Sequence, residues 1–110
     1  MNPSKITLKI TPEQLNVILD GVNEVPPIMG NAPAQMVVQS IFDELLTKLL
    51  KKQIEKRHEP PNKAFSLKLK YYEAYALSEV LARIRMLLPN DFIYEKNAVS
   101  RINRQIYGQL

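Results

Sequence analysis

Apolar and polar residues alternate in two short segments of the chain, and a helix-like stretch follows each of them. In residues 5–10 (KITLKI) the apolar side chains occupy every second position, and residues 65–70 (FSLKLK) have the same period. A period of two is typical of a strand with one buried face. We therefore expect strands at 5–10 and 65–70, with apolar residues pointing inward and polar residues pointing outward.

Four further stretches carry apolar residues at helical spacing. The first covers about 12–21 or slightly beyond, and Thr11 with Gln14 has the pattern of a capping box. The second covers about 33–57 and opens near Asn31. Its apolar positions form a face wider than one amphipathic stripe, which favours a central position or contact with a second subunit.

The third helix is expected at about 72–88, ending before Pro89, and the fourth follows a cap at Asn90 or Asp91. The apolar faces of these helices and of the first should meet the inner face of the strands. The helical residues expected in this core are Leu15, Ile18, Leu19, Val22, Ala74, Leu77, Leu81, Ile84, Leu88, Val99, Ile102, Ile106 and Leu110.

The order strand-helix-helix thus occurs twice, in residues 5–57 and 64–110. A shift of 59 residues takes the first strand onto the second, with Lys9 on Lys68, and a shift of 61 takes the second helix onto the fourth. The two-residue change lies in the interhelix loop, where length changes cost little. Either the chain contains a pseudo-two-fold internal repeat, or two amphipathic patterns coincide. We predict a single domain over residues 1–110, of α+β class and mostly helical, with its two strands paired and antiparallel by preference.

The length of the second helix restricts how the strands can pair. A helix over 33–57 is ~37 Å long at ~1.5 Å per residue. The linker 58–63 can return the chain by at most ~20 Å. Either this helix ends early, or it lies across the structure, or the strands pair between two chains.

The composition narrows the chemistry that the chain can perform. It contains no cysteine and one histidine, His58, which lies in a charged segment beside two prolines. There is accordingly no disulfide, thiolate zinc site or cysteine nucleophile. No local spacing indicates a catalytic carboxylate pair or a phosphate-binding glycine loop. We expect no enzymatic activity, no bound metal and no cofactor.

Charge is unevenly distributed along the chain. Residues 1–59 hold seven basic and seven acidic residues, whereas residues 60–110 hold eight and four, which accounts for the net charge of +4. A mild basic excess permits contact with a polyanion. Because the chain has no long apolar run and no signal-peptide core, we expect a cytoplasmic protein without a membrane partner.

The outward faces of the two strands form the most specific feature of the sequence. If the strands pair, one solvent-facing ribbon carries Lys5, Thr7, Lys9, Ser66, Lys68 and Lys70. A two-stranded ribbon fits the DNA major groove, where Lys, Thr and Ser can contact base edges or phosphates. A polar face with edge lysines is also the ordinary solvated surface of a small sheet.

One segment and the order of the elements together resemble a known family. The segment KITLKITPEQL, the later Gly30-Asn31 ahead of an amphipathic helix, and the strand-helix-helix order resemble the ribbon-helix-helix DNA-binding domains, most closely over residues 5–22. In that family two copies pair their strands antiparallel, and outward strand residues read the major groove. The N-terminus of the second helix holds a phosphate through its backbone amides.

The resemblance implies a role for each outward residue of the ribbon. Lys5, Thr7 and Lys9 would read bases, with Asn31 at the phosphate-binding helix start. The second copy's readers would be Ser66, Lys68 and Lys70. One chain would then supply both halves of a ribbon that two chains normally make.

Two functions are compatible with these patterns. The first is a small DNA-binding protein of ribbon-helix-helix type, such as a transcriptional regulator or a mobile-element accessory factor. The second is a helical homodimer for protein–protein assembly, with Phe42, Leu46 and Leu50 of the second helix at its interface. The expected partners are therefore DNA and a second copy of the chain. An outer ribbon face open to solvent would favour the first function, and a covered face would exclude it.

Overall fold

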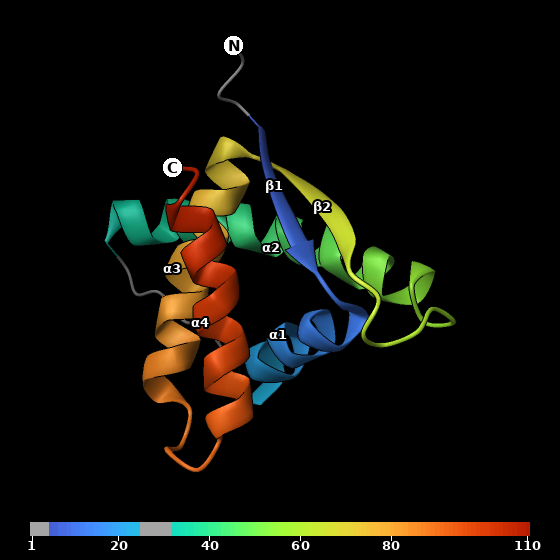
Figure 1. Cartoon of the computed structure of the whole chain (residues 1–110). Helices are drawn as coiled ribbons and strands as arrows, with labels where there is room; N and C mark the ends of the chain where they lie inside the picture. Colours follow the sequence, from blue (N-terminus) through green and yellow to red (C-terminus); the bar gives the residue numbers. More distant parts are fainter. Residues whose placement is uncertain (1–4, 25–31) are drawn as a thin grey trace.

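Four helices pack beneath a two-stranded sheet in the computed structural model, which describes residues 5–24 and 32–110 (Figure 1). In chain order the elements are β1 (Lys5–Ile10), α1 (Pro12–Glu24), α2 (Pro33–Glu55), β2 (Phe65–Lys70), α3 (Tyr71–Leu87) and α4 (Ile93–Tyr107). The fold is therefore α+β and mostly helical, as the sequence predicts. The order strand-helix-helix occurs twice within it.

The two strands pair antiparallel within the one chain. Lys5 lies opposite Lys70, Leu8 opposite Leu67, and Lys9 opposite Ser66. The inward apolar residues of both strands are buried, except for the first residue of β2, which is partly buried. This burial pattern confirms the predicted alternation. A sheet of only two strands is marginal by itself, so its stability depends on burying one face of each strand.

The helices that follow the strands begin with the same kind of contact. At the start of α1, the Thr11 amide donates to Gln14 Oε1 at 2.9 Å and the Gln14 amide donates to Thr11 Oγ1 at 3.1 Å. At the start of α3, the Lys70 amide donates to Glu73 Oε1 at 2.8 Å. Both pairs satisfy amides that a helix cannot satisfy itself. The predicted cap at Thr11 is confirmed, and α3 has half of the same motif.

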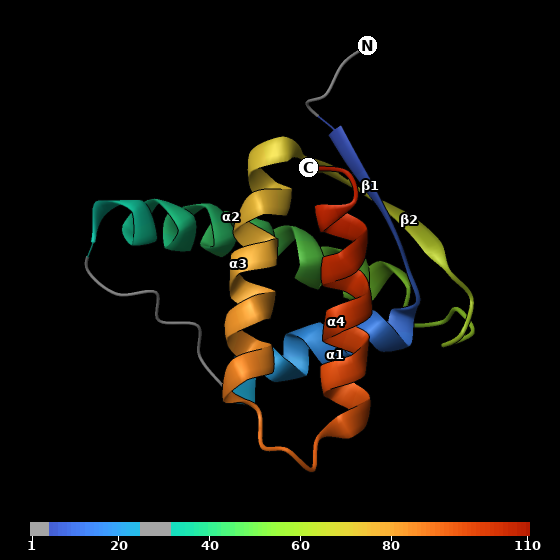
Figure 2. The ribbon, with the colours of Figure 1, turned by 60° about the vertical axis from the view of Figure 1, so that its left-hand side comes forward.

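The path of α2 resolves how the chain returns to form the second strand. This helix ends at Glu55, two residues before the predicted end, and it lies across the molecule with its C-terminal half approaching β2 (Figure 1, Figure 2). Residues 56–64 then need only turn the chain back to the sheet. The helix thus both ends early and lies across the structure, and this lets the two strands of one chain pair.

The start of α4 differs from the sequence prediction. Asn90 and Asp91 do not cap this helix; the N-cap residue is Phe92, whose amide donates to the Pro89 carbonyl at 3.0 Å. Asn90 and Asp91 lie within this turn, and the helix begins at Ile93. The capping prediction was wrong because a polar residue after a proline suits a turn as well as a cap.

One hydrophobic core joins both halves of the chain. The α1 helix packs on α4 and α2 packs on α3, so helices of each half contact helices of the other. Almost every helical residue expected in the core is buried; Val22 is only partly buried, and Leu110, which follows α4, is 39% exposed. An origin of the two halves by duplication stays a prediction. Within the described residues, no helix is long and apolar enough to cross a membrane.

Candidate nucleic-acid interface

The outer surface of the sheet, which we call the ribbon face, is open to solvent. Its six side chains are all exposed, and they alternate with the buried residues of the two strands. Both strands lie at the periphery of the molecule with the helices on their inner side (Figure 1, Figure 2). The ribbon face consists of Lys5, Thr7, Lys9, Ser66, Lys68 and Lys70.

The ribbon face is cationic throughout. Four of its six residues are lysines and none is acidic. In the described part of the chain, no carboxylate lies within ion-pairing distance of any of these four lysines. Across the strands, Thr7 faces Lys68 and Lys9 faces Ser66, so each of these two rows pairs one lysine with one hydroxyl.

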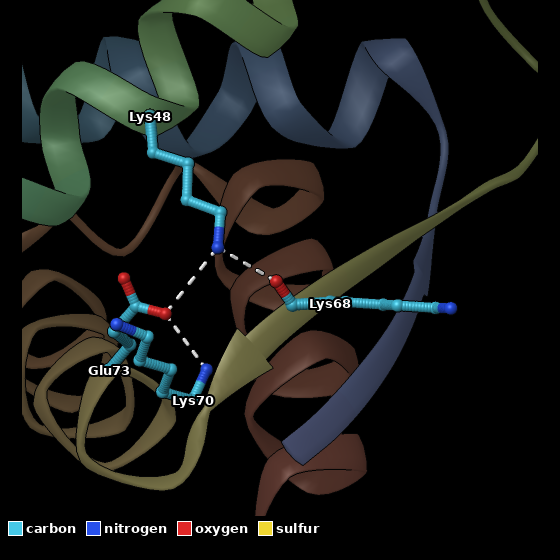
Figure 3. A network of polar contacts seen from close by, with 4 residues as sticks. All are labelled: Lys48, Lys68, Lys70 and Glu73. Atoms are coloured by element: carbon cyan, nitrogen blue, oxygen red, sulfur yellow. Dashed lines mark hydrogen bonds and ion pairs between the residues drawn. The ribbon is translucent and has the colours of Figure 1, made fainter.

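A polar network fixes the junction between β2 and α3 (Figure 3). Lys48 Nζ donates to the Lys68 carbonyl oxygen at 2.9 Å and lies 3.4 Å from Glu73 Oε1, which also accepts the Lys70 amide. The Lys68 side chain points away from Lys48 and Glu73. The network therefore holds the backbone of the strand and leaves the Lys68 ammonium group in solvent.

The last lysine of β2 lies beside an aromatic ring. Lys70 Nζ is 5.7 Å from the centroid of the Tyr72 ring, within the range of a cation–π contact. A hydrogen bond with Tyr72, followed by the charges of Tyr72 and Glu73, raises the pKa of Lys70 above its ordinary value. Lys70 is therefore fully protonated at neutral pH.

Two glutamines, one in α4 and one just beyond its end, close the free edge of β1. Gln105 binds the backbone of Lys9, accepting its amide proton and donating to its carbonyl, both at 2.9 Å. Gln109 binds the backbone of Thr7 in the same way, at 3.1 and 2.8 Å. The edge is thus paired, while the side chains of Thr7 and Lys9 stay in solvent. Sequence reasoning missed both glutamines, because their four-residue spacing is also that of a solvated helix face.

The phosphate-binding helix start implied by the resemblance is not part of this surface. Asn31 lies outside the described residues. The described start of α2 lies on the side of the molecule away from both strands, whereas its C-terminal half approaches β2 (Figure 1, Figure 2). The candidate interface therefore consists of the ribbon face alone.

The residues expected at a homodimer interface belong mainly to the chain's own core. Phe42 is 1% exposed and packs among the core residues, so it is not available to a second chain. Leu46 is partly buried against the same core. Leu50 alone of the three is substantially exposed, at 43%. The buried part of the apolar face of α2 meets α1 on one side and α3 on the other, whereas Met36, Val37 and Ile54 are exposed.

The remaining candidate features of the described residues lie outside the ribbon face. A cleft of about 500 Å³ between α1 and the end of α2 is lined by residues such as Leu15, Gln53 and Arg57, and none of its lining residues belongs to the ribbon face. His58 is exposed. Within the described ranges, no three His, Cys, Asp or Glu side chains are grouped so that they could hold a metal ion.

Comparisons with protein-family models, with curated proteins and with solved structures find no match to this chain. The resemblance to ribbon-helix-helix domains stays a prediction. The function has to be inferred from the residues of the ribbon face and from their geometry.

Proposed function

We propose that this chain is a small, non-enzymatic DNA-binding protein that places its ribbon face in the major groove. The observation that carries the proposal is the ribbon face itself, where four lysines and two hydroxyl side chains are exposed on one side of a complete antiparallel pair. No acidic residue interrupts this surface. Such a surface is complementary to the phosphates and base edges of a duplex.

The dimensions of the ribbon suit the groove. Paired strands lie about 4.8 Å apart, and the major groove is about 12 Å wide, which admits a two-stranded ribbon with its side chains. The helices lie on the opposite side of the sheet, so they would not obstruct the approach of a duplex (Figure 2). The side chains that enter the groove would be those of the ribbon face.

The residue types of the ribbon face match the groups that a groove presents. Lys9 and Lys68 can donate to guanine O6 and N7 or to phosphate oxygens. Thr7 and Ser66 can donate to or accept from either base edges or the backbone. We therefore assign base contacts to the side chains in the middle of the ribbon, and phosphate contacts to its lysines in general.

Edge protection does not explain the lysines. Lysine on a sheet often prevents edge-to-edge pairing, but here Gln105 and Gln109 already occupy the edge of β1, and Lys48 contacts that of β2. In addition, Lys5 faces Lys70 directly, and like charges in opposite positions destabilise a strand pair. An anionic partner that contacts both lysines would offset the repulsion between their positive charges.

The homodimer hypothesis has less support from the same structure. Phe42 and Leu46 contribute to the chain's own core, which leaves Leu50 as the exposed member of the expected interface. The ribbon is complete within one chain. DNA binding as proposed therefore requires no second copy.

The proposal is tested by removing the two central lysines. Lys9→Ala/Lys68→Ala should bind a duplex selected from a random-sequence pool about 30-fold more weakly than the unmodified chain, taking the low end of about 1–3 kcal/mol for each of the two base contacts. Binding of the unmodified chain should fall steeply with salt, because phosphate contacts release counterions. Fluorescence anisotropy across a salt series measures both effects.

The matched control removes two positive charges far from the ribbon. Arg85 and Lys96 lie near the α3–α4 turn, at the opposite end of the molecule from the strands (Figure 1). Arg85→Ala/Lys96→Ala should bind nearly as tightly as the unmodified chain. Circular dichroism verifies that both double variants are folded. Equal affinities of the two variants would reject the ribbon as the DNA-binding surface.

A further inference from the structure

The pairing register coincides with the internal sequence repeat at the middle of the ribbon. The 59-residue shift takes Leu8 onto Leu67, and these two residues lie directly opposite each other. When the partners at the middle of an antiparallel pair are also repeat equivalents, a pseudo-two-fold axis passes between them. This axis relates Lys9 to Lys68 on the ribbon face. The central rows of the ribbon are therefore nearly symmetric.

The two ends of the ribbon break this symmetry. By the same shift, Lys5 corresponds to Ala64 and Lys70 corresponds to Thr11. Lys5 and Lys70 lie opposite each other, so both lysines are at one end, which we call the lysine end. The other end, which we call the threonine end, has Thr11 and Ala64 at the corresponding positions and carries no charge there.

Side chains just beyond the strands increase this difference. At the lysine end, Tyr72 is 47% exposed and lies beside the Lys70 ammonium group. The 59-residue shift relates Tyr72 to Glu13 of α1, which is not aromatic and lies against Tyr94 of α4. One end of the ribbon therefore combines two cations with an aromatic ring, and the other end has a neutral pair at the corresponding positions.

We infer that the ribbon binds duplex DNA in a single orientation, with the lysine end over the more tightly held half of the site. This inference rests on the proposed function. The pseudo-two-fold centre would present nearly the same groups to both halves of a site, so it cannot select a direction. The ends can, because the lysine end has two cations that attract phosphates at positions where the threonine end has neutral residues.

A single chain can encode such a direction, whereas two identical chains cannot. In a ribbon made by two copies, the two-fold axis would make both ends alike. Here both strands belong to one chain, and their sequences differ at the ends. The preferred site should therefore be an asymmetric duplex whose halves are only approximately related by inversion.

Site-directed cleavage can measure the orientation directly. Because the chain contains no cysteine, Asn62→Cys introduces a unique thiol at an exposed position beside the threonine end. An iron chelate attached to this thiol cuts DNA in its neighbourhood. On a duplex selected from a random-sequence pool, cleavage should occur on one flank of the site. Equal cleavage on both flanks would overturn the inference.

A charge-transfer variant provides the second arm of the experiment. Lys5→Ala/Ala64→Lys moves one positive charge from the lysine end to the threonine end without changing the net charge. In the Asn62→Cys background, this variant should produce cleavage on the second flank as well, while the salt dependence of binding stays the same. Arg85→Ala/Met86→Lys, which moves a charge by one residue at a distant exposed site, should leave the cleavage pattern unchanged.

The outcomes separate the inference from the proposed function. If the unmodified chain enriches no duplex, the proposed function fails and the inference fails with it. If a duplex is enriched but is cut equally on both flanks, or if the charge transfer leaves one-flank cleavage unaltered, only the inference fails.

Discussion

β1 and β2 form one ladder, but different helices close their outer edges in different ways. Gln105 of α4 and Gln109, which follows the end of that helix, make four hydrogen bonds to the backbone of β1. The edge of β2 receives one hydrogen bond from α2, donated by Lys48. In the 61-residue shift that relates α2 to α4, Lys48 corresponds to Gln109. Two positions that the shift relates thus perform unequal tasks.

The difference follows from the chemistry of the two side chains. A glutamine amide carries both a donor and an acceptor, so it can bind the N–H and C=O groups of one strand residue together. A lysine carries only donors, so Lys48 can reach a carbonyl but cannot accept an amide proton. On β2 the Lys70 amide is bound instead by Glu73. The fold thus positions a helix beside each edge, but residue type decides how completely that edge is paired.

The largest expected effects test whether the two strands are equivalent at their centre. Leu8→Ala and Leu67→Ala should each lower the free energy of unfolding by about 2–5 kcal/mol, because both leave a cavity in a close-packed core. The two losses should be similar, since the residues face each other and are exposed by 0% and 2%. Chemical denaturation measures both. Leu50→Ala, at an exposed position, is the control and should have little effect, and a strongly unequal pair would contradict the pseudo-symmetry.

An intermediate effect is expected at the edges. Gln105→Met/Gln109→Met should lower the free energy of unfolding by about 2 kcal/mol, the low end for four hydrogen bonds that compete with water. Lys48→Met should cost less, about 1 kcal/mol. Methionine keeps a similar length and helix propensity. Amide exchange by NMR should accelerate at Thr7 and Lys9 in the first variant only; acceleration there in the second would contradict the assignment of edges.

The smallest effect concerns the two helix starts. Thr11→Ala should lower the free energy of unfolding by about 1 kcal/mol, because it removes the hydroxyl that caps the Gln14 amide. Lys70→Ala should leave it nearly unchanged, since the α3 cap makes no side-chain hydrogen bond. Thermal unfolding of the two variants at matched concentration measures the difference. Equal losses would show that the starts of α1 and α3 are capped alike.

Much of the fold could be predicted because its signals are local. Alternation in KITLKI and FSLKLK identified both strands, and Thr11 with Gln14 identified a helix start, since each pattern depends on neighbouring residues alone. Prediction failed at Asn90 and Asp91, whose residue types suit a turn and a cap equally well. The wide apolar face of α2 was also ambiguous, because contact with two helices of the same chain and contact with a second chain leave the same pattern.

The sequence by itself determined which residues point outward, and hence the composition of the ribbon face, because side chains of a strand alternate between its faces. Only the tertiary structure decided that the strands pair within one chain, with Leu8 opposite Leu67 and Lys5 opposite Lys70. It also decided that Gln105 and Gln109 close an edge that lies 96 and 102 residues away in the chain. Such contacts depend on how α2 and α4 pack across the shared core, and no local pattern encodes that packing.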